Sequence, residues 1–126
     1  MALLCLACNF PSLEIVDSLE LGPDGTNDEI TLQTLSCSSC DFLGVAVYEE
    51  SRRGGGESWH HFGCRTTPSG FAELSRALRA CPAPREPRCG CVAHEKYRAK
   101  NQLGSIDPFS YIEALEPRGP LKLPRS

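Results

Sequence analysis

The sequence lacks any long apolar run, and its first residues lack the features of an export signal. A transmembrane helix needs about 20 consecutive apolar residues, and no stretch of the 126 residues approaches that length. The apolar residues 1–8 have no positively charged flank and stop at Asn9, which makes them too short for a signal peptide. We therefore expect no membrane contact and a cytoplasmic location, where thiols stay reduced and free to bind metals.

Familiar catalytic patterns are also missing. His94-Glu95 begins like the His-Glu-x-x-His helix of zinc proteases, but Arg98 stands where the second histidine belongs. The deaminase pattern of His-x-Glu followed by Pro-Cys-x-x-Cys is absent. The Gly54-Gly55-Gly56 run is more simply a hairpin loop than a phosphate cradle. These absences favour a non-enzyme over an enzyme.

Charge is distributed unevenly along the chain. Residues 1–63 hold ten Asp or Glu against two Arg, and residues 64–126 hold eleven Lys or Arg against six Asp or Glu. The two halves therefore carry net charges of −8 and +5. The acidic half would repel a long nucleic-acid duplex, so any such contact has to be local, short or single-stranded. Two solvated faces are the simpler interpretation.

Cysteine, in contrast, is abundant, with eight among 126 residues. Cys5 and Cys8 form one Cys-x-x-Cys pair, and Cys37 and Cys40 form a second pair after a gap of 28 residues. Each pair brings two thiolates to one turn, so that four sulfurs can surround Zn²⁺ in a tetrahedron. A redox Cys-x-x-Cys would open an amphipathic helix, and neither pair is followed by one. The spacing therefore predicts one four-thiolate zinc site.

A second set of metal-ligand residues flanks a proline-rich segment. Its members are Cys81, Cys89, Cys91 and His94. Cys91 and His94 are three residues apart, which places both on one side of a helical turn. Zinc would then staple the stiff loop at both ends. In the alternative interpretation Cys81 is a buried residue of the preceding helix and the other cysteines are free thiols.

The segment Trp59-His60-His61-Phe62-Gly63-Cys64 complicates the choice of ligands. His61 and Cys64 are alternative ligands that can replace a member of the second set or add a third, open site. Adjacent histidines on a strand point to opposite faces, so at most one of His60 and His61 reaches a given metal. In the simpler interpretation, each histidine makes hydrogen bonds to its neighbours or to solvent and binds no metal.

Hydrophobic periodicity predicts strands first and helices later, an α+β fold. Alternating apolar residues predict strands within 13–21, for which a helix is the alternative, and within 30–32, arranged as one antiparallel hairpin. An apolar, β-branched run at 42–48 and the aromatic residues at 59–62 predict a second antiparallel hairpin. Helical spacing from Phe71 to Cys81 predicts a helix that ends at Pro82. Shorter helices are expected near 92–98 and from Pro108 to about Leu115. The predicted parts are a β part at 1–66, a helical Cys/His part at 67–115 packed on it, and a flexible tail at 116–126.

Cysteine pairs followed by strands rather than by helices resemble the zinc-ribbon group of folds over the first half of the chain. The resemblance implies small antiparallel hairpins held by metal. Zinc ribbons serve in nucleic-acid machinery, as protein-docking modules and as structural modules, so the resemblance implies no narrower function. We expect two structural zinc ions per chain, because bound metal compensates for a small core.

The sequence therefore favours a non-catalytic zinc adaptor that binds a protein partner, through the ribbon or through the aromatic edge at Trp59 and Phe62. One alternative is a protein that binds single-stranded nucleic acid, in which basic residues follow the metal loop and an aromatic ring stacks on a base. Candidate contacts are Trp59, Arg85, Arg88, Lys96, Tyr97, Arg98 and Lys100. The other alternative is a zinc-dependent nuclease or hydrolase that uses His60 or His61. The oligomeric state is not predicted.

Overall fold

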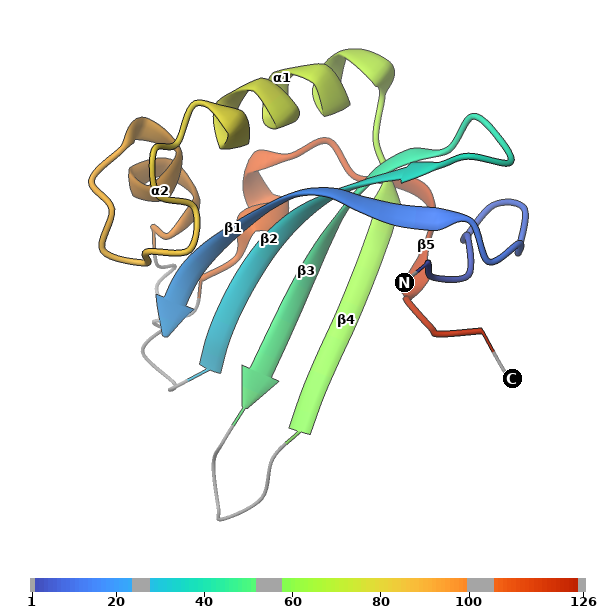
Figure 1. Ribbon diagram of the computed structural model, residues 1–126, viewed down its shortest axis with the longest axis horizontal. Helices are drawn as coiled ribbons and strands as arrows, with labels where there is room; N and C mark the ends of the chain where they lie inside the picture. The colour runs from blue at the N-terminus through green and yellow to red at the C-terminus, as the bar shows by residue number, and fades with distance from the viewer. Residues whose placement is uncertain (1, 24–27, 52–57, 100–105, 125–126) are drawn as a thin grey trace.

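The computed structural model describes residues 2–23, 28–51, 58–99 and 106–124. Five strands form one antiparallel sheet in which the spatial order follows the chain order (Figure 1). The strands are β1 (Leu13–Pro23), β2 (Asp28–Cys37), β3 (Leu43–Ser51), β4 (Ser58–Arg65) and β5 (Leu115–Pro120). Helices α1 (Pro68–Arg79) and α2 (Val92–Tyr97) and a 3-10 turn, η2 (Pro108–Tyr111), lie between β4 and β5 in the chain. This is an α+β arrangement.

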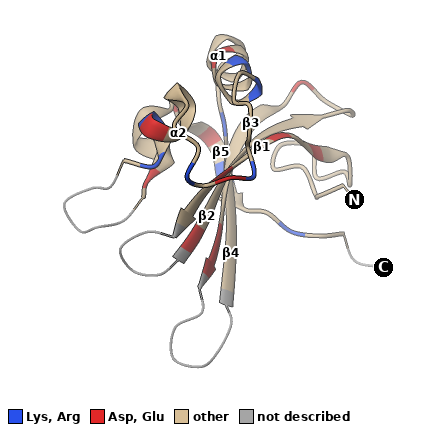
Figure 2. Cartoon of the chain, turned by 60° about the vertical axis from the view of Figure 1, so that its left-hand side comes forward, with Lys and Arg blue, Asp and Glu red and all other residues tan. Residues whose placement is uncertain are grey.

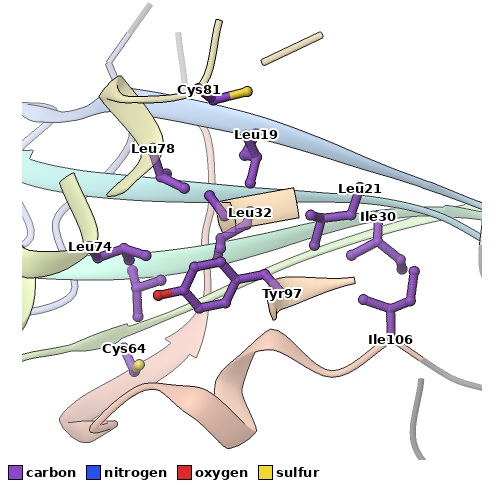
Figure 3. Packing of buried hydrophobic residues seen from close by; sticks show 12 residues of the cluster. Leu19, Leu21, Ile30, Leu32, Cys64, Leu74, Leu78, Cys81, Tyr97 and Ile106 are labelled. Atoms are coloured by element: carbon purple, nitrogen blue, oxygen red, sulfur yellow. The ribbon is translucent and has the colours of Figure 1, made fainter. Parts of the chain in front are cut away.

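One face of the sheet packs against the helices (Figure 3). Leu19, Leu32 and Val45 are fully buried there, from three neighbouring strands. Leu74 and Leu78, one turn apart on α1, complete the packing from above. Their spacing is the reason that the sequence predicts this helix. The core joins the strands to the helical segment, and the division of the chain at residue 66 stays a prediction.

A second, smaller apolar cluster lies on the opposite face. It is built from residues near the two ends of the chain and from the β2–β3 connection. Its buried members are Leu3, Cys5, Leu13, Leu35, Cys37, Phe42, Ala46 and Leu121. Two cysteines of the predicted first metal site therefore belong to a packed core and not to a surface loop.

Helix α1 begins and ends as its sequence indicates. The Thr67 hydroxyl accepts a hydrogen bond from Gly70 N–H at 3.0 Å, and Pro68 occupies the first turn, where its missing N–H costs nothing. Arg76 and Arg79 lie in the last turn, where they favour the negative end of the helix dipole. The helix ends at Arg79, and Cys81 lies just beyond it. None of the described helices has the length and apolar content needed to cross a bilayer.

The C-terminal segment differs from the prediction. Residues 116–126 are predicted to be a flexible tail, but residues up to Pro120 belong to β5, which pairs with β4 from Phe62 to Arg65. The strand forms because Leu121 N–H reaches the carbonyl of His61 at 2.7 Å and the Leu121 side chain is buried in the smaller cluster. The helix predicted from Pro108 to Leu115 is shortened to η2, and the chain then turns into this strand.

Candidate metal centres

The first cluster joins a turn near the N-terminus to the turn between β2 and β3. Cys5 and Cys8 come from the first turn, Cys37 is the last residue of β2, and Cys40 lies in the turn that follows it. The four sulfurs all lie within 4.8 Å of one another. Cys5 Sγ is 3.7 Å from Cys40 Sγ, and Cys8 Sγ is 3.7 Å from Cys37 Sγ.

These distances match a metal site. Four sulfurs about 2.3 Å from a central zinc ion form a tetrahedron whose edges are about 3.8 Å long. A disulfide would require about 2.05 Å between sulfurs, and all eight cysteines are free thiols. The arrangement therefore fits a tetrahedral cation such as Zn²⁺.

Hydrogen-bond donors surround the first cluster. Ala7 N–H donates to Cys5 Sγ at 3.4 Å, and Ser39 N–H donates to Cys37 Sγ at 3.3 Å. The Ser12 hydroxyl lies 3.1 Å from Cys37 Sγ. Donors of this kind stabilise thiolates, which are the form that binds metal. The Cys-x-x-Cys spacing does not reveal this contact of Ser12 with Cys37.

The thiols of the first cluster have very different acidities. Burial alone would raise the pKa of Cys37, but the hydrogen bonds from Ser12 and Ser39 outweigh burial and lower that pKa to about 6. The Phe42 amide lowers the pKa of Cys40, but burial and the neighbouring thiols outweigh this effect and raise that pKa to about 12. One thiol thus ionises easily, while another resists ionisation beside it. A divalent cation removes this conflict because it compensates several thiolates at once.

The second cluster lies at the other end of the molecule from the first, beside α2 (Figure 1). Its members Cys81, Cys89, Cys91 and His94 have ligand atoms within 4.8 Å of one another. Cys81 Sγ is 3.7 Å from Cys89 Sγ. His94 Nδ1 is 3.3 Å from Cys81 Sγ and 3.2 Å from Cys91 Sγ. The proline-rich loop thus begins and ends on clustered ligand atoms.

The orientation of His94 is the strongest local sign of a metal ligand. The ring is fully buried, and its Nε2 atom lies 3.0 Å from the carbonyl oxygen of Glu20 in β1. If Nε2 carries the proton and donates it to this carbonyl, Nδ1 presents its lone pair to the three sulfurs. Metal-binding histidines usually donate the N–H of their other ring nitrogen to a neighbouring acceptor in this way. Glu20 and His94 are 74 residues apart in the chain, so the spacing of residues within a short segment cannot reveal this contact.

The second cluster shows the same contrast in acidity. Burial raises the pKa of Cys81 to about 11, with further increases from Cys89 and Cys91. Burial alone would raise the pKa of Cys91, but the hydrogen bond from the His94 N–H and the contacts with neighbouring side chains outweigh burial and lower that pKa to about 6. Cys91 is the N-cap of α2, where its sulfur accepts from His94 N–H at 3.4 Å. The residue that caps the start of this helix is therefore also a member of the second cluster.

The alternative ligands lie outside both clusters. His61 Nε2 is 2.6 Å from Gln33 Oε1, and the ring meets Tyr48 edge-on at 5.5 Å. Burial lowers the pKa of His61. Cys64 is buried in the larger core, where burial raises the pKa of its thiol. Among the described residues, no third group of His, Cys, Asp or Glu is close enough to hold a metal.

His60 lies on the opposite face of β4 from His61, as strand alternation predicts. Its side chain lines a hollow of about 320 Å³ beside Glu49, Phe62 and Asp107. The two histidines therefore cannot act on the same bound group.

The structure brings two of the predicted nucleic-acid contacts together, since Arg88 and Arg98 line one hollow along with two acidic residues. Tyr97 is only 4% exposed, so its ring cannot stack on a base. Arg98 pairs with Glu95 at 2.6 Å and also donates to the Pro87 carbonyl. Arg85 and Arg88 are exposed on the proline-rich loop, Lys96 lies over the Tyr97 ring, and Lys100 lies outside the described residues. Figure 2 shows basic residues on α1 and around α2, with acidic residues among them.

Comparison with protein-family models, with curated proteins and with solved structures finds no match. The functional assignment therefore depends on the geometry of the two clusters.

Proposed function

We propose that this protein is a zinc-stabilised binding module with two structural Zn²⁺ ions and no catalytic role for either ion. The observation that supports it is the pair of four-ligand clusters with near-tetrahedral spacing. Three cysteines with one histidine, and four cysteines, are both common ligand sets of structural zinc. A catalytic zinc keeps one position open for water or substrate, whereas each of these sets supplies four protein ligands.

The first cluster also supports the zinc-ribbon resemblance. One cysteine pair precedes β1, and the other runs from Cys37, the last residue of β2, to Cys40, just before β3, so each pair leads into a strand. The hairpin of β1 and β2 leaves the cluster and returns to it. Five strands and two helices extend this pattern well beyond a minimal ribbon. A reducing compartment such as the cytoplasm is part of the proposal, because reducing conditions keep cysteines out of disulfides and available to bind metal.

We further propose that the module acts by binding another protein around Trp59, in the part of β4 that precedes its pairing with β5. Trp59 is 67% exposed, and Phe62, on the opposite face of the same strand, is 41% exposed. Exposed tryptophan is enriched at the centre of protein interfaces because its large ring contributes much of the binding energy. The single-stranded nucleic-acid alternative is less well supported, since Tyr97 is buried and Arg98 is already paired.

Metal analysis tests the zinc assignment. Protein purified without added chelator should contain two zinc ions per chain, and X-ray absorption should show sulfur at about 2.3 Å with a minor nitrogen contribution. Replacing Cys8 with serine, or Cys89 with serine, should each remove one zinc, whereas the matched variant Cys64→Ser should retain both. Two zinc ions bound by Cys8→Ser and Cys89→Ser alike would contradict the assignment.

Partner binding requires a separate test. Cross-linking in cell extract should capture a protein with the wild type and lose it with Trp59→Ala, but not with the control Tyr111→Ala. Tyr111 is also exposed, at 45%, but it lies in η2. The same capture by all three proteins would contradict a role for Trp59. Salt-sensitive binding of single-stranded nucleic acid would favour the alternative instead.

A further inference from the structure

The outer edge of β1 is covered by the loop that carries the second cluster. β1 is an end strand of the sheet, and in the described part of the chain its outer side carries only a single bridge, between Leu3 and Leu13, and no further strand. At Glu20 both backbone groups on that side are occupied. Glu20 N–H donates to the Pro84 carbonyl at 2.8 Å, and the Glu20 carbonyl contacts His94 Nε2 at 3.0 Å. We call residues 81–89 the strap.

The strap follows the edge rather than touching it once. Pro87 packs so closely against Gly22 that a Cβ atom there would lie 2.7 Å from Pro87 Cβ. Pro84 contacts the strand at Glu20, and Pro87 contacts it at Gly22. A step of three residues along the strap therefore matches a step of two residues along the strand. Proline cannot donate to a ladder, which prevents the strap from becoming a regular sixth strand. Apart from the hydrogen bond that Arg98 donates to the Pro87 carbonyl, its attachment therefore depends on its ends.

Both ends of the strap are ligands. Cys81 stands at its start and Cys89 at its end, and Cys91 and His94 follow directly. The same His94 ring that offers Nδ1 to the cluster covers the Glu20 carbonyl through Nε2. Loss of the metal would release the strap, and both outward groups of Glu20 would then need new partners.

The charges at this edge indicate which kind of strand would replace the strap. Glu14 and Glu20 are exposed on β1, and Ile15 and Val16 are 42% and 41% exposed. Arg85 of the strap lines a hollow of about 490 Å³ together with Glu20. Arg85 lies in a turn of the strap, and the strap thus already places a basic residue beside an acidic strand. A second copy of β1 would bring like charges together, which disfavours self-pairing.

We propose that the second cluster is a metal-controlled latch on a strand-pairing edge. With metal bound, the strap occupies the outer edge of β1. Without it, the strap detaches, the rest of the sheet remains folded around the first cluster, and the edge binds an extended basic peptide of a partner protein by β-augmentation. The latch depends on the proposed zinc binding, and it adds a regulated binding site to that function.

Hydrogen exchange tests the latch. In the zinc-loaded wild type the Glu20 amide should be protected, and in Cys89→Ala/Cys91→Ala it should exchange at least tenfold faster. The Leu32 and Val45 amides, in the inner strands, should keep their protection in both proteins. Gly90→Ala is the matched control, because it lies between the two cysteines and its added methyl group meets no atom within 4 Å.

A peptide titration tests the exposed edge. A nine-residue peptide of alternating Thr and Lys should bind the double-cysteine variant at least tenfold more tightly than it binds the zinc-loaded wild type. An alternating Thr and Glu peptide should bind neither protein, and Glu20→Lys in the variant should weaken binding of the basic peptide. Equal binding to wild type and variant, or no binding to either, would overturn the proposed partner.

Zinc content separates this proposal from the previous one. Wild type without zinc would contradict the zinc assignment itself. Two zinc ions in the wild type and one in the variant, with an unchanged Glu20 amide, would overturn only the latch. Global loss of protection in the variant would also overturn the latch, because the second cluster would then support the whole fold rather than the strap.

Discussion

Asp17 joins the edge of the sheet to the helix that covers it. Its carboxylate accepts hydrogen bonds from the hydroxyls of Thr34 at 2.8 Å and Ser75 at 2.7 Å. Arg79 Nε donates to the same carboxylate at 2.8 Å. Asp17 follows a register shift in β1, and its own N–H donates to Thr34 Oγ1 at 3.0 Å. The irregularity in the strand therefore aims an acidic side chain at α1.

Replacing Asp17 with asparagine should lower the free energy of unfolding by about 1–3 kcal/mol. The change removes the charge of an acceptor and leaves nearly buried donors without a full set of partners. Urea unfolding of the zinc-loaded protein at pH 7 measures the loss. Glu14→Gln, on the exposed part of the same strand, is the control and should stay within about 0.5 kcal/mol of wild type. An equal loss in both variants would contradict the role of the network.

The effect of Asp17 should also have a defined pH range. Burial alone would raise its pKa, but donation from Arg79, Ser75 and Thr34 outweighs burial and lowers that pKa. The stability that Asp17 contributes is therefore complete above the unfolded pKa of about 3.9 and is lost as pH falls through the lower folded pKa. The stability difference between wild type and Asp17→Asn should be the same at pH 7 and pH 5.5. A marked decrease across that range would contradict the direction of the shift.

Gly44 is a position where any side chain should be harmful. An added Cβ would meet the Cys64 carbonyl oxygen and would lie 2.6 Å from the Phe42 ring. Overpacking of this kind costs about 1–3 kcal/mol, so Gly44→Ala should lower the urea midpoint. Gly90→Ala, which meets nothing within 4 Å, should leave the midpoint almost unchanged. Comparable midpoints for the two variants would show that β3 and β4 move apart without cost.

At the scale of secondary-structure elements, β5 connects the end of the chain to the first cluster. Leu121 is 8% exposed and belongs to the same apolar cluster as Cys5 and Cys37. Leu121→Ala should destabilise the protein by about 2–5 kcal/mol, because it leaves a cavity among packed side chains. Leu123, at 58% exposure, offers a matched control whose change to alanine should cost about 0.5 kcal/mol or less. Thermal melting would show similar midpoints for both variants if the segment were a mobile tail.

The sequence predicts the elements whose signals are local. α1 is predicted because Leu74 and Leu78 repeat at helical spacing, and β1 because its apolar residues alternate. β5 escapes prediction because Leu115–Pro120 contains two prolines and a glycine and no β-branched residue. Only its pairing with β4 makes this segment a strand, and no feature within the segment itself predicts that pairing.

The same distinction applies to the clusters. Cys-x-x-Cys spacing predicts the grouping of Cys5, Cys8, Cys37 and Cys40, and the flanks of the proline-rich segment predict the second group. The groups that orient these ligands are not predictable in this way. Ser12 and the Glu20 carbonyl reach their ligands only after β1 has paired and the strap has folded across it.

At the scale of the whole molecule, stability should depend on the concentration of free zinc. A metal that binds only the folded chain stabilises it by about 2.7 kcal/mol per site at 100 times its dissociation constant. Melting in zinc buffers of increasing free concentration should therefore raise the transition temperature continuously. Full metal removal by a strong chelator should unfold the chain. A transition temperature that is independent of both treatments would contradict structural zinc.

The order of the sheet also has a consequence for synthesis on the ribosome. Because β1 to β5 lie side by side in chain order, each strand that leaves the exit tunnel finds its partner already outside. All four cysteines of the first cluster lie within residues 5–40 and emerge before β5, and Leu121, directly after β5, packs in the same apolar cluster as Cys5 and Cys37. A nascent chain stalled before residue 115 should therefore hold its first metal in a partly uncovered site, open to exchange with cellular metal donors. The last strand would then complete the protection of an ion acquired much earlier in translation.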